Sequence, residues 1–435
     1  MLMYNKAMET LPLEQLRKLQ SERLVNLLQR VYHKVPFYKK KLDEAGIHPN
    51  DIKGLEDLSK LPFTKKTDLR DHYPFGLFAE PMDNVRRIHA SSGTTGKPTV
   101  VGYTQDDLEV FDEVVARSLA CAGARPGMKL HNAYGYGLFT GGLGMHGGAT
   151  KLGMAVIPVS GGMTERQLTI LQDFEPEVIC CTPSYAQTLS DEFAKRGIDT
   201  QHLALKYAVL GAEPWTEAIR TQVETGLNVK ASNIYGLSEI IGPGVSQEDF
   251  EEQGTGSYIW EDHFFPEVVD KNTGKPLPYG QEGVLVFTTL TKQALPILRY
   301  WTNDICSIDY DKNGKRTHIK MSPIKGRADD MLIIRGVNLF HTQVEDVING
   351  MDFLVPNYQL HVKRKGTMDA VEVHAEVKNG VNVQDESLSH VFSKKIKDSI
   401  GLSMNVILKN PGEIPMSQGG KLSRIVDWRK APIEK

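Results

Sequence analysis

The chain has 435 residues, and its 51 Lys and Arg against 54 Asp and Glu give a formal net charge of −3 at pH 7. This length predicts two or three domains, and 40% hydrophobic with 24% charged residues is typical of a globular protein. Because there is no basic excess, we do not expect nucleic acid as a partner.

The cysteines form no C-x-x-C pair. They are Cys121, Cys180, Cys181 and Cys306. This pattern argues against a disulfide framework and a cysteine zinc site, and favours reduced thiols in a cytoplasmic protein. The first twenty residues lack the apolar run of a signal peptide. The sequence contains no run of 18 apolar residues, so we expect no membrane-spanning helix. We therefore expect a cytoplasmic protein without a membrane partner.

Residues 13–45 carry apolar side chains at three- and four-residue spacings, which predicts helices. Residues 58–76 are rich in proline and turn residues, which predicts a connector. From about residue 86, β-rich runs alternate with helical stretches, and Thr104 is the expected cap of a helix over 105–123. The alternation predicts β-sheets covered by helices, an α/β class. Strands are predicted at 85–90, 99–104, 154–160, 177–183, 207–213 and 228–236, and further helices at 164–174, 184–197 and 215–226.

A second unit is predicted to begin near residue 327. Residues 329–340 read as one strand, and 342–351 as a helix with Thr342 as its cap. Strand, strand, helix and strand follow, which predicts a small α+β domain of roughly 110 residues. These last elements are expected at 357–365, 370–377, 388–402 and 405–410.

The stretch SSGTTGKPT at residues 91–99 departs from a Walker loop. Ser91 stands where the first glycine is required, and Pro98 stands where a magnesium-binding hydroxyl is required. A predicted strand follows, so the helix N-terminus that normally holds the phosphate is absent. A Ser/Thr/Gly loop between two strands can still close over a triphosphate through amides, hydroxyls and Lys97. We therefore predict an ATP-binding loop, with a polar hairpin turn as the alternative.

Five segments occur in the order used by adenylate-forming acyl-CoA ligases: SSGTTGKPT, NIYGLSE, RYWTND, GRADDMLIIRG and a terminal GGK. Longer segments resemble the phenylacetate–CoA ligase branch of that family, among them VPFYKKKLDEAG, YGYGLFTGGLG, YGLSEIIGPGV and IWEDHFFPEVVD. The likeness covers nearly the whole chain. It implies a large N-terminal adenylation domain over 1–326, with a helical opening segment at 1–80, and a small mobile α+β lid domain over 327–435.

The resemblance implies a reaction in two halves. An aryl acid, in the first place phenylacetate, attacks the α-phosphate of ATP and gives an acyl adenylate and pyrophosphate. The thiol of coenzyme A then displaces AMP and leaves a thioester. In both half-reactions negative charge develops around the phosphorus or the acyl carbon. The site therefore needs fixed cations and hydrogen-bond donors more than an acid–base pair. ATP, Mg²⁺ and coenzyme A are the expected cofactor and substrates, and analogy alone suggests a homodimer.

The resemblance also assigns roles to single residues. Lys421 is the catalytic lysine of adenylation, Glu239 the magnesium ligand and Asp329 the hinge. Asp304 is expected to accept hydrogen bonds from both ribose hydroxyls, although Trp301 and Asn303 beside it stand where the branch often has arginine. The residues expected to bind ATP are Ser91, Ser92, Gly93, Thr94, Thr95, Gly96, Lys97, Gly211, Ala212, Glu213, Pro214, Tyr235, Gly236, Ser238, Asp304 and Arg327.

An acid pocket is predicted from aromatic and small residues, which suit a flat apolar acid. Its members are Tyr136, Phe139, Gly141, Gly142 and Pro243, and packing in the core is the alternative role of each. No zinc is expected, because residues 247–253, after the GPGV block where some relatives carry zinc-binding cysteines, hold none. His131, His146, His263 and His341 also lack the i, i+4 spacing of a helical zinc pair.

Three alternatives stay open. The acid can be another aryl acid, such as indoleacetate, hydroxyphenylacetate or benzoate. The acyl group can pass to a carrier-protein thiol instead of coenzyme A. Outside enzymes, the chain can be a module that senses a nucleotide and an aryl acid, although a sensor does not need Lys421, Glu239 and the hinge motif together.

Overall fold

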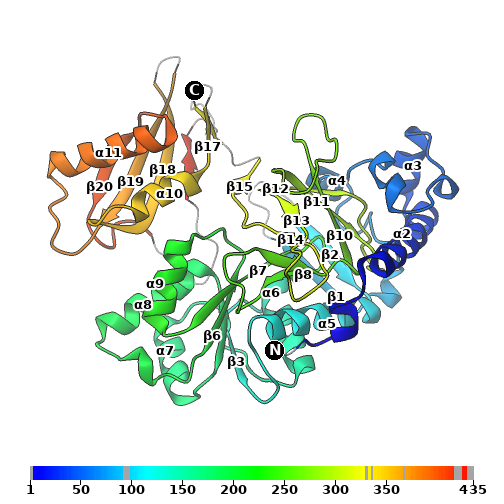
Figure 1. The fold of residues 1–435 in the computed structure, drawn as a ribbon, viewed down its shortest axis with the longest axis horizontal. Helices are drawn as coiled ribbons and strands as arrows, with labels where there is room; N and C mark the ends of the chain where they lie inside the picture. Colours follow the sequence, from blue (N-terminus) through cyan, green and yellow to red (C-terminus); the bar gives the residue numbers. More distant parts are fainter. Residues whose placement is uncertain are drawn as a thin grey trace.

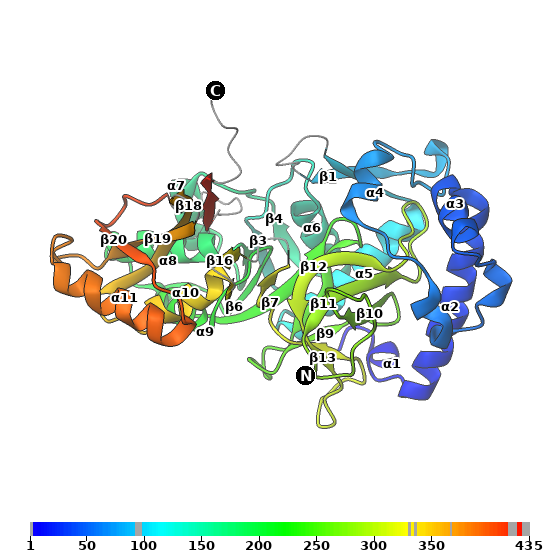
Figure 2. The same cartoon turned by 90° about the horizontal axis from the view of Figure 1, so that it is seen from above.

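The structure is a computed structural model, and it describes residues 3–91, 98–328, 332–334, 337–365, 368–415 and 424–428. Figure 1 and Figure 2 show a large body that holds the N-terminal three quarters of the chain, and a small body formed by the C-terminal strands and helices. Buried apolar side chains between Leu332 and Leu408 form a core of their own, separate from the cores of the large body. No helix among the described residues has the length and apolarity needed to cross a membrane.

The chain opens with helices that pack against one side of the large body (Figure 1). The long helix buries Leu24, Leu28 and Val31 in a cluster that also holds Leu298, which comes from a distant part of the sequence. The helices predicted over 13–45 are confirmed, and the predicted connector contains short helices. These elements are α1 (Lys6–Glu9), α2 (Leu13–Lys34), α3 (Pro36–Glu44) and α4 (Lys66–Asp71), with 3₁₀ turns at Pro49–Asp51 and Leu55–Lys60.

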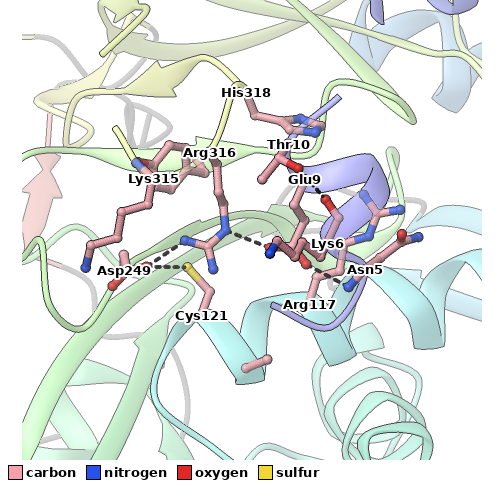
Figure 3. Close-up of polar contacts among 12 residues, drawn as sticks. Asn5, Lys6, Glu9, Thr10, Arg117, Cys121, Asp249, Lys315, Arg316 and His318 are labelled. Atoms are coloured by element: carbon pink, nitrogen blue, oxygen red, sulfur yellow. Dashed lines mark hydrogen bonds and ion pairs between the residues drawn. The ribbon is translucent and has the colours of Figure 1, made fainter. Parts of the chain in front are cut away.

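A buried ion cluster fixes α1 to the large body (Figure 3). Arg316 Nε lies 2.7 Å from Glu9 Oε2, and Arg316 Nη1 lies 2.6 Å from Asp249 Oδ2. All three side chains are at most 1% exposed. Cys121 Sγ approaches Asp249 Oδ2 at 3.8 Å, and His318 Nε2 lies 3.1 Å from the carbonyl oxygen of Met8. The N-terminal turn is therefore a structural part of the large body.

The main sheet has nine strands in the order β13-β14-β9-β8-β7-β6-β5-β3-β4, with a parallel half from β4 to β7. Successive residues of a strand face opposite sides. Accordingly, Val178 and Cys180 enter the core beneath α5 and α6, and Ile179 and Cys181 enter the core beneath α7, α8 and α9. The strands are β3 (Lys129–Asn132), β4 (Ala155–Ile157), β5 (Val178–Cys181), β6 (Tyr207–Gly211), β7 (Lys230–Leu237), β8 (Gly242–Glu248), β9 (Ser257–Ile259), β13 (Ile308–Asp309) and β14 (Lys320–Met321).

Helices cover both faces of this sheet, as predicted from the alternation of patterns. Thr104 caps the first of them, because its side chain accepts a hydrogen bond from Asp107 N at 3.1 Å and Asp107 Oδ2 accepts one from Thr104 N at 2.9 Å. The helices are α5 (Gln105–Cys121), α6 (Thr140–Leu152), α7 (Thr164–Asp173), α8 (Pro183–Lys195) and α9 (Glu217–Leu227), and a 3₁₀ turn spans Thr200–His202.

Two antiparallel units complete the large body. A hairpin of β1 (Arg87–Ser91) and β2 (Thr99–Tyr103) flanks the loop 92–97, which lies outside the described residues. A four-stranded sheet in the order β10-β11-β12-β15 leads to the small body. Its strands are β10 (Phe264–Val269), β11 (Gly283–Thr289), β12 (Tyr300–Cys306) and β15 (Gly326–Arg327).

The small body packs α10 and α11 on a sheet in the order β20-β19-β18-β21. The prediction of one strand over 329–340 is wrong, because β16 and β17 form a hairpin in which Ile334 pairs with Val337. Thr342 is not the helix cap, since Phe340 holds that position and Thr342 Oγ1 donates to the carbonyl of Lys325 at 2.7 Å. The elements are β16 (Leu332–Ile334), β17 (Val337–Leu339), α10 (His341–Asn349), β18 (Leu354–Lys365), β19 (Met368–Val377), α11 (Glu386–Ile400), β20 (Asn405–Lys409) and β21 (Ile425–Asp427).

Candidate active site

A cavity of about 190 Å³ lies at the ends of β1 and β7 and beside β12 and β15. It brings together five predicted site residues from four separate segments, namely Ser91, Ser238, Glu239, Asp304 and Arg327. The remaining lining residues are Lys66, Leu237, Tyr300, Trp301, Thr302 and Asn303. Ser91 Oγ is buried and has no hydrogen-bond partner among the described residues.

The turn between β7 and β8 sets the position of Glu239. Gly236 and Gly242 approach so closely that a Cβ on Gly236 would lie 1.9 Å from the carbonyl oxygen of Gly242. Gly242 has a φ of +116°, which favours glycine. Glu239 is 7% exposed, and Tyr300 Oη donates a hydrogen bond to its Oε1 at 3.1 Å. Burial and the Glu239 charge raise the pKa of Tyr300 well above its usual value, so this phenol stays a donor.

Asp304 accepts hydrogen bonds from two sides. Tyr235 Oη donates to Oδ2 at 2.6 Å, and Arg327 Nη1 donates to Oδ1 at 3.2 Å. Burial, followed by the negative charge of Asp304, raises the pKa of Tyr235 well above its usual value. A carboxylate is an acceptor with about four lone-pair positions, which suits Asp304 to adjacent hydroxyl donors.

Residues 211–214, with the sequence GAEP, lie at the carboxyl end of β6, where open α/β sheets commonly bind ligands. Ala212 has a φ of +73°, a strained conformation for a residue with a Cβ. Glu213 Oε2 accepts a hydrogen bond from Ser184 Oγ at 2.6 Å, which orients this segment. The segment does not line the 190 Å³ cavity, so its role as an adenine wall stays a prediction. Tyr235 packs its ring against Phe287, with centroids 6.3 Å apart, and its adenine contact also stays a prediction.

The five predicted acid-pocket residues lie on neighbouring elements but outside that cavity. Tyr136 accepts a hydrogen bond from Asn132 Nδ2 at 2.8 Å, and burial raises the pKa of Tyr136 to about 12. Phe139 is 52% exposed at the start of α6. Gly142 allows a close approach, because a Cβ there would lie 2.4 Å from the carbonyl oxygen of Gly135. Gly141 precedes Gly142 in α6. Pro243 of β8 pairs with Gly236 of β7. A 3.1 Å contact between the hydroxyls of Thr140 and Ser238 joins α6 to the β7–β8 turn.

Several predicted residues lie outside the described part of the chain. They are Ser92, Gly93, Thr94, Thr95, Gly96 and Lys97 of the loop, Asp329 of the hinge motif and the lysine Lys421. Their roles stay predictions.

Among the lining residues that were not predicted from the sequence, Tyr300 and Thr302 lie on β12 close to Asp304. Trp301 and Asn303 line the cavity too, and β12 is irregular at Asn303, so simple alternation along the strand could not have found them. Trp301 Nε1 donates to Asn303 Oδ1 at 2.8 Å, and Asn303 has a φ of +68°. The two residues that depart from the family pattern therefore bind each other beside Asp304.

The donor set at the cavity suits a cation that takes few protein ligands. Among the described residues, no group of three or more His, Cys, Asp or Glu could hold a metal ion. Magnesium is commonly bound through one or two carboxylates together with substrate phosphates and water. Glu239, with a buried carboxylate at the cavity, fits that mode.

The chain matches the family model of AMP-binding enzymes over residues 10–291 and that of the AMP-binding enzyme C-terminal domain over residues 336–429. The chain belongs to the AMP-binding enzyme family. Members of this adenylate-forming family share the large α/β domain and small C-terminal domain described above.

Two curated relatives of this AMP-binding enzyme are similar over nearly their whole length. The phenylacetate–coenzyme A ligase of Thermus thermophilus is 62% identical over 99% of this chain and 100% of the relative. The phenylacetate–coenzyme A ligase of Escherichia coli is 49% identical over 97% of each chain.

A 2-hydroxyisobutyryl-CoA ligase provides a structural comparison. Its postadenylation state, in complex with 2-HIB-AMP, has a TM-score of 0.91 at 27% identity over 98% of this chain and 92% of that chain. Its thioesterification state, in complex with 2-HIB-AMP and CoA, has a TM-score of 0.73 over 97% of this chain and 91% of that chain. The arrangement of the two bodies in this structure is thus more similar to the postadenylation state.

Proposed function

We propose that this acid–CoA ligase joins phenylacetate to coenzyme A through an acyl adenylate, with release of AMP and pyrophosphate. The observation that carries this proposal is the cavity that gathers Glu239, Asp304 and Arg327 from separate segments. The relatives named phenylacetate–coenzyme A ligase support the choice of acid.

In the first half-reaction, the carboxylate of the acid attacks the α-phosphate of ATP. Asp304 would hold the ribose hydroxyls, with Tyr235 and Arg327 fixing the orientation of its carboxylate. The loop residues Ser91, Ser92, Gly93, Thr94, Thr95, Gly96 and Lys97 would donate to the phosphates.

Glu239 would be the magnesium ligand, because its carboxylate is buried at the cavity and is held by Tyr300. When bound, Mg²⁺ supplies positive charge to the phosphates. Tyr300 holds the Glu239 carboxylate in one orientation, so this side chain would not lose further conformational freedom when Mg²⁺ binds.

The small body would act as the lid. We place the border between residues 326 and 327, with Asp329 as the hinge and Lys421 as the lysine that reaches the forming bond. As Lys421 approaches, its ammonium would neutralise the acid carboxylate and the α-phosphate together. In the second half-reaction, the lid would turn and let the thiol of coenzyme A attack the acyl carbon, with AMP as the leaving group. A cytoplasmic location and a homodimer belong to the same proposal.

The choice of acid is tested by a panel of aryl acids with ATP and coenzyme A. Phenylacetate, 4-hydroxyphenylacetate, indoleacetate and benzoate are compared through AMP formation and thioester yield. We expect phenylacetate to have the highest kcat/KM, roughly tenfold above benzoate, which lacks one methylene. Thioester formation only on a carrier protein, or equal kcat/KM for all four acids, would contradict the proposal.

A further inference from the structure

A second cavity, of about 380 Å³, lies between α2 and the segment that follows β11. Four of its lining side chains are cationic and none is a carboxylate. The cations are Arg23, Arg30 and Lys34 of α2 and Lys292 of the facing segment, and the other lining residues are Asn26, Leu27, Leu290, Thr291 and Gln293.

Carboxylates lie near these cations but do not line the cavity. Glu80 Oε1 pairs with both Arg30 and Lys34, so one carboxylate serves two cations. Arg23 donates to the backbone carbonyl of Asp262, whose carboxylate instead binds Arg117 at 2.9 and 3.0 Å. The residues that line the cavity therefore present four cations and no carboxylate, and the carboxylates that act on them lie outside the lining.

Lys292 is the most buried of the four cations. It is 3% exposed, and its ammonium lies 3.4 Å from the backbone oxygen of Glu239 and 4.7 Å from the centre of the Tyr103 ring. Its ammonium donates to no carboxylate among the described residues, but the charges of Asp107 and Glu239 act on it. The nearby Asp107 carboxylate accepts hydrogen bonds from the backbone N–H groups of Gln293 and Ala294. The Asp107 and Glu239 carboxylates stabilise this buried ammonium through their charges, and an anion in the cavity would add to that stabilisation.

We propose that this cavity, separate from the nucleotide site, binds a phosphate-bearing anion. Its volume corresponds to roughly a dozen waters at ~30 Å³ each, enough for pyrophosphate or for two phosphate groups of a larger molecule. Lys292 connects the two sites, because its ammonium contacts the backbone of the magnesium-binding residue Glu239. Occupancy of the cavity is therefore expected to change the apparent affinity for Mg²⁺–ATP.

The test measures anion binding by calorimetry on the full chain, with α,β-methylene-ATP and Mg²⁺ filling the nucleotide site. The probes are inorganic phosphate, pyrophosphate and adenosine 3′,5′-bisphosphate. We expect one equivalent of at least one probe to bind, more weakly at higher salt. Binding of phosphate or pyrophosphate identifies a free anion, whereas binding of the bisphosphate alone identifies the phosphates of a larger molecule.

The variants test whether this cavity is the site. The double variant Arg30→Gln/Lys34→Gln should weaken binding about tenfold or more, the loss expected for charge-assisted hydrogen bonds. Lys18→Gln, on an exposed position of the same helix, should leave it unchanged. Glu80→Gln frees both cations and should strengthen binding several-fold. Absence of binding by all three probes, or equal binding by the wild type, the double variant and Glu80→Gln, would overturn the proposal.

Discussion

Asp304 and Arg327 lie directly opposite each other on the antiparallel strands β12 and β15, and Arg327 Nη1 donates to Asp304 Oδ1 at 3.2 Å. Asp304 is the proposed ribose acceptor, and Arg327 is the first residue of the proposed lid. An ion pair therefore joins the proposed nucleotide site to the proposed border between the two bodies, so we expect ribose binding to alter the position of Arg327.

Asp304→Asn should raise the KM for ATP by roughly tenfold or more, because the amide keeps the shape but loses the charged acceptor. Steady-state kinetics at saturating acid and coenzyme A measure the change. The matched control is Asp309→Asn, an exposed aspartate on β13, which should keep the wild-type KM. Equal KM values for the two variants would remove Asp304 from the nucleotide site.

Glu239→Gln should raise the Mg²⁺ concentration for half-maximal activity by roughly tenfold or more, because a neutral amide is a weaker ligand for a hard cation. Tyr300→Phe removes only the hydrogen bond that orients the carboxylate, and should cause a smaller rise. A titration of AMP formation with Mg²⁺ gives both values. A larger effect of Tyr300→Phe than of Glu239→Gln would contradict the assignment.

Lys421→Ala should lower the rate of adenylate formation by roughly 100- to 1000-fold, the scale seen when a charge-stabilising group is removed. Thioester formation from supplied phenylacetyl adenylate should change far less, because the lysine acts in the first half-reaction. Lys409→Ala, at a lysine of the small body that pairs with Glu413, is the control. Equal losses in both half-reactions would exclude the role proposed for Lys421.

The sequence predicted the architecture well where one local pattern decides it. Thr104 caps α5 through a reciprocal pair of hydrogen bonds, and the strand–helix alternation marks both faces of the main sheet. The prediction that Thr342 caps α10 was wrong, because its hydroxyl donates a hydrogen bond to the carbonyl of Lys325 instead of accepting one from the first turn of the helix. Motifs predicted Glu239 and Asp304, but the supporting Tyr300 depends on which face of β12 meets the β7–β8 turn, and that is a tertiary property.

Glu9→Gln should lower the free energy of unfolding by about 3 kcal/mol, because it leaves Arg316 with a buried charge that is only partly compensated. Urea unfolding followed by tryptophan fluorescence measures the loss. Glu14→Gln, on the exposed side of α2, is the control and should stay near the wild type. If the two variants unfold at the same urea concentration, the cluster does not anchor the N-terminal turn.

His131 should make the large body sensitive to acid. Burial lowers the pKa of His131 to about 4, below its ordinary value of 6.5, so the unfolded chain binds this proton first as the pH falls. Stability is then lost between about pH 6.5 and pH 4, by up to roughly 3 kcal/mol. His131→Gln should lose less stability than the wild type between pH 7.5 and pH 5.0 in urea unfolding. His202→Gln, whose parent side chain is 86% exposed, should behave like the wild type, and an unchanged acid response of His131→Gln would refute this origin.

The ion cluster at Arg316 also bears on how the protein is made. Arg316 leaves the ribosome 307 residues after Glu9, and at ~5–20 residues per second that separation corresponds to roughly 15–60 s of synthesis. Throughout this time Glu9 lacks its Arg316 partner, so the ion cluster can form only after almost all of the large body has been synthesised.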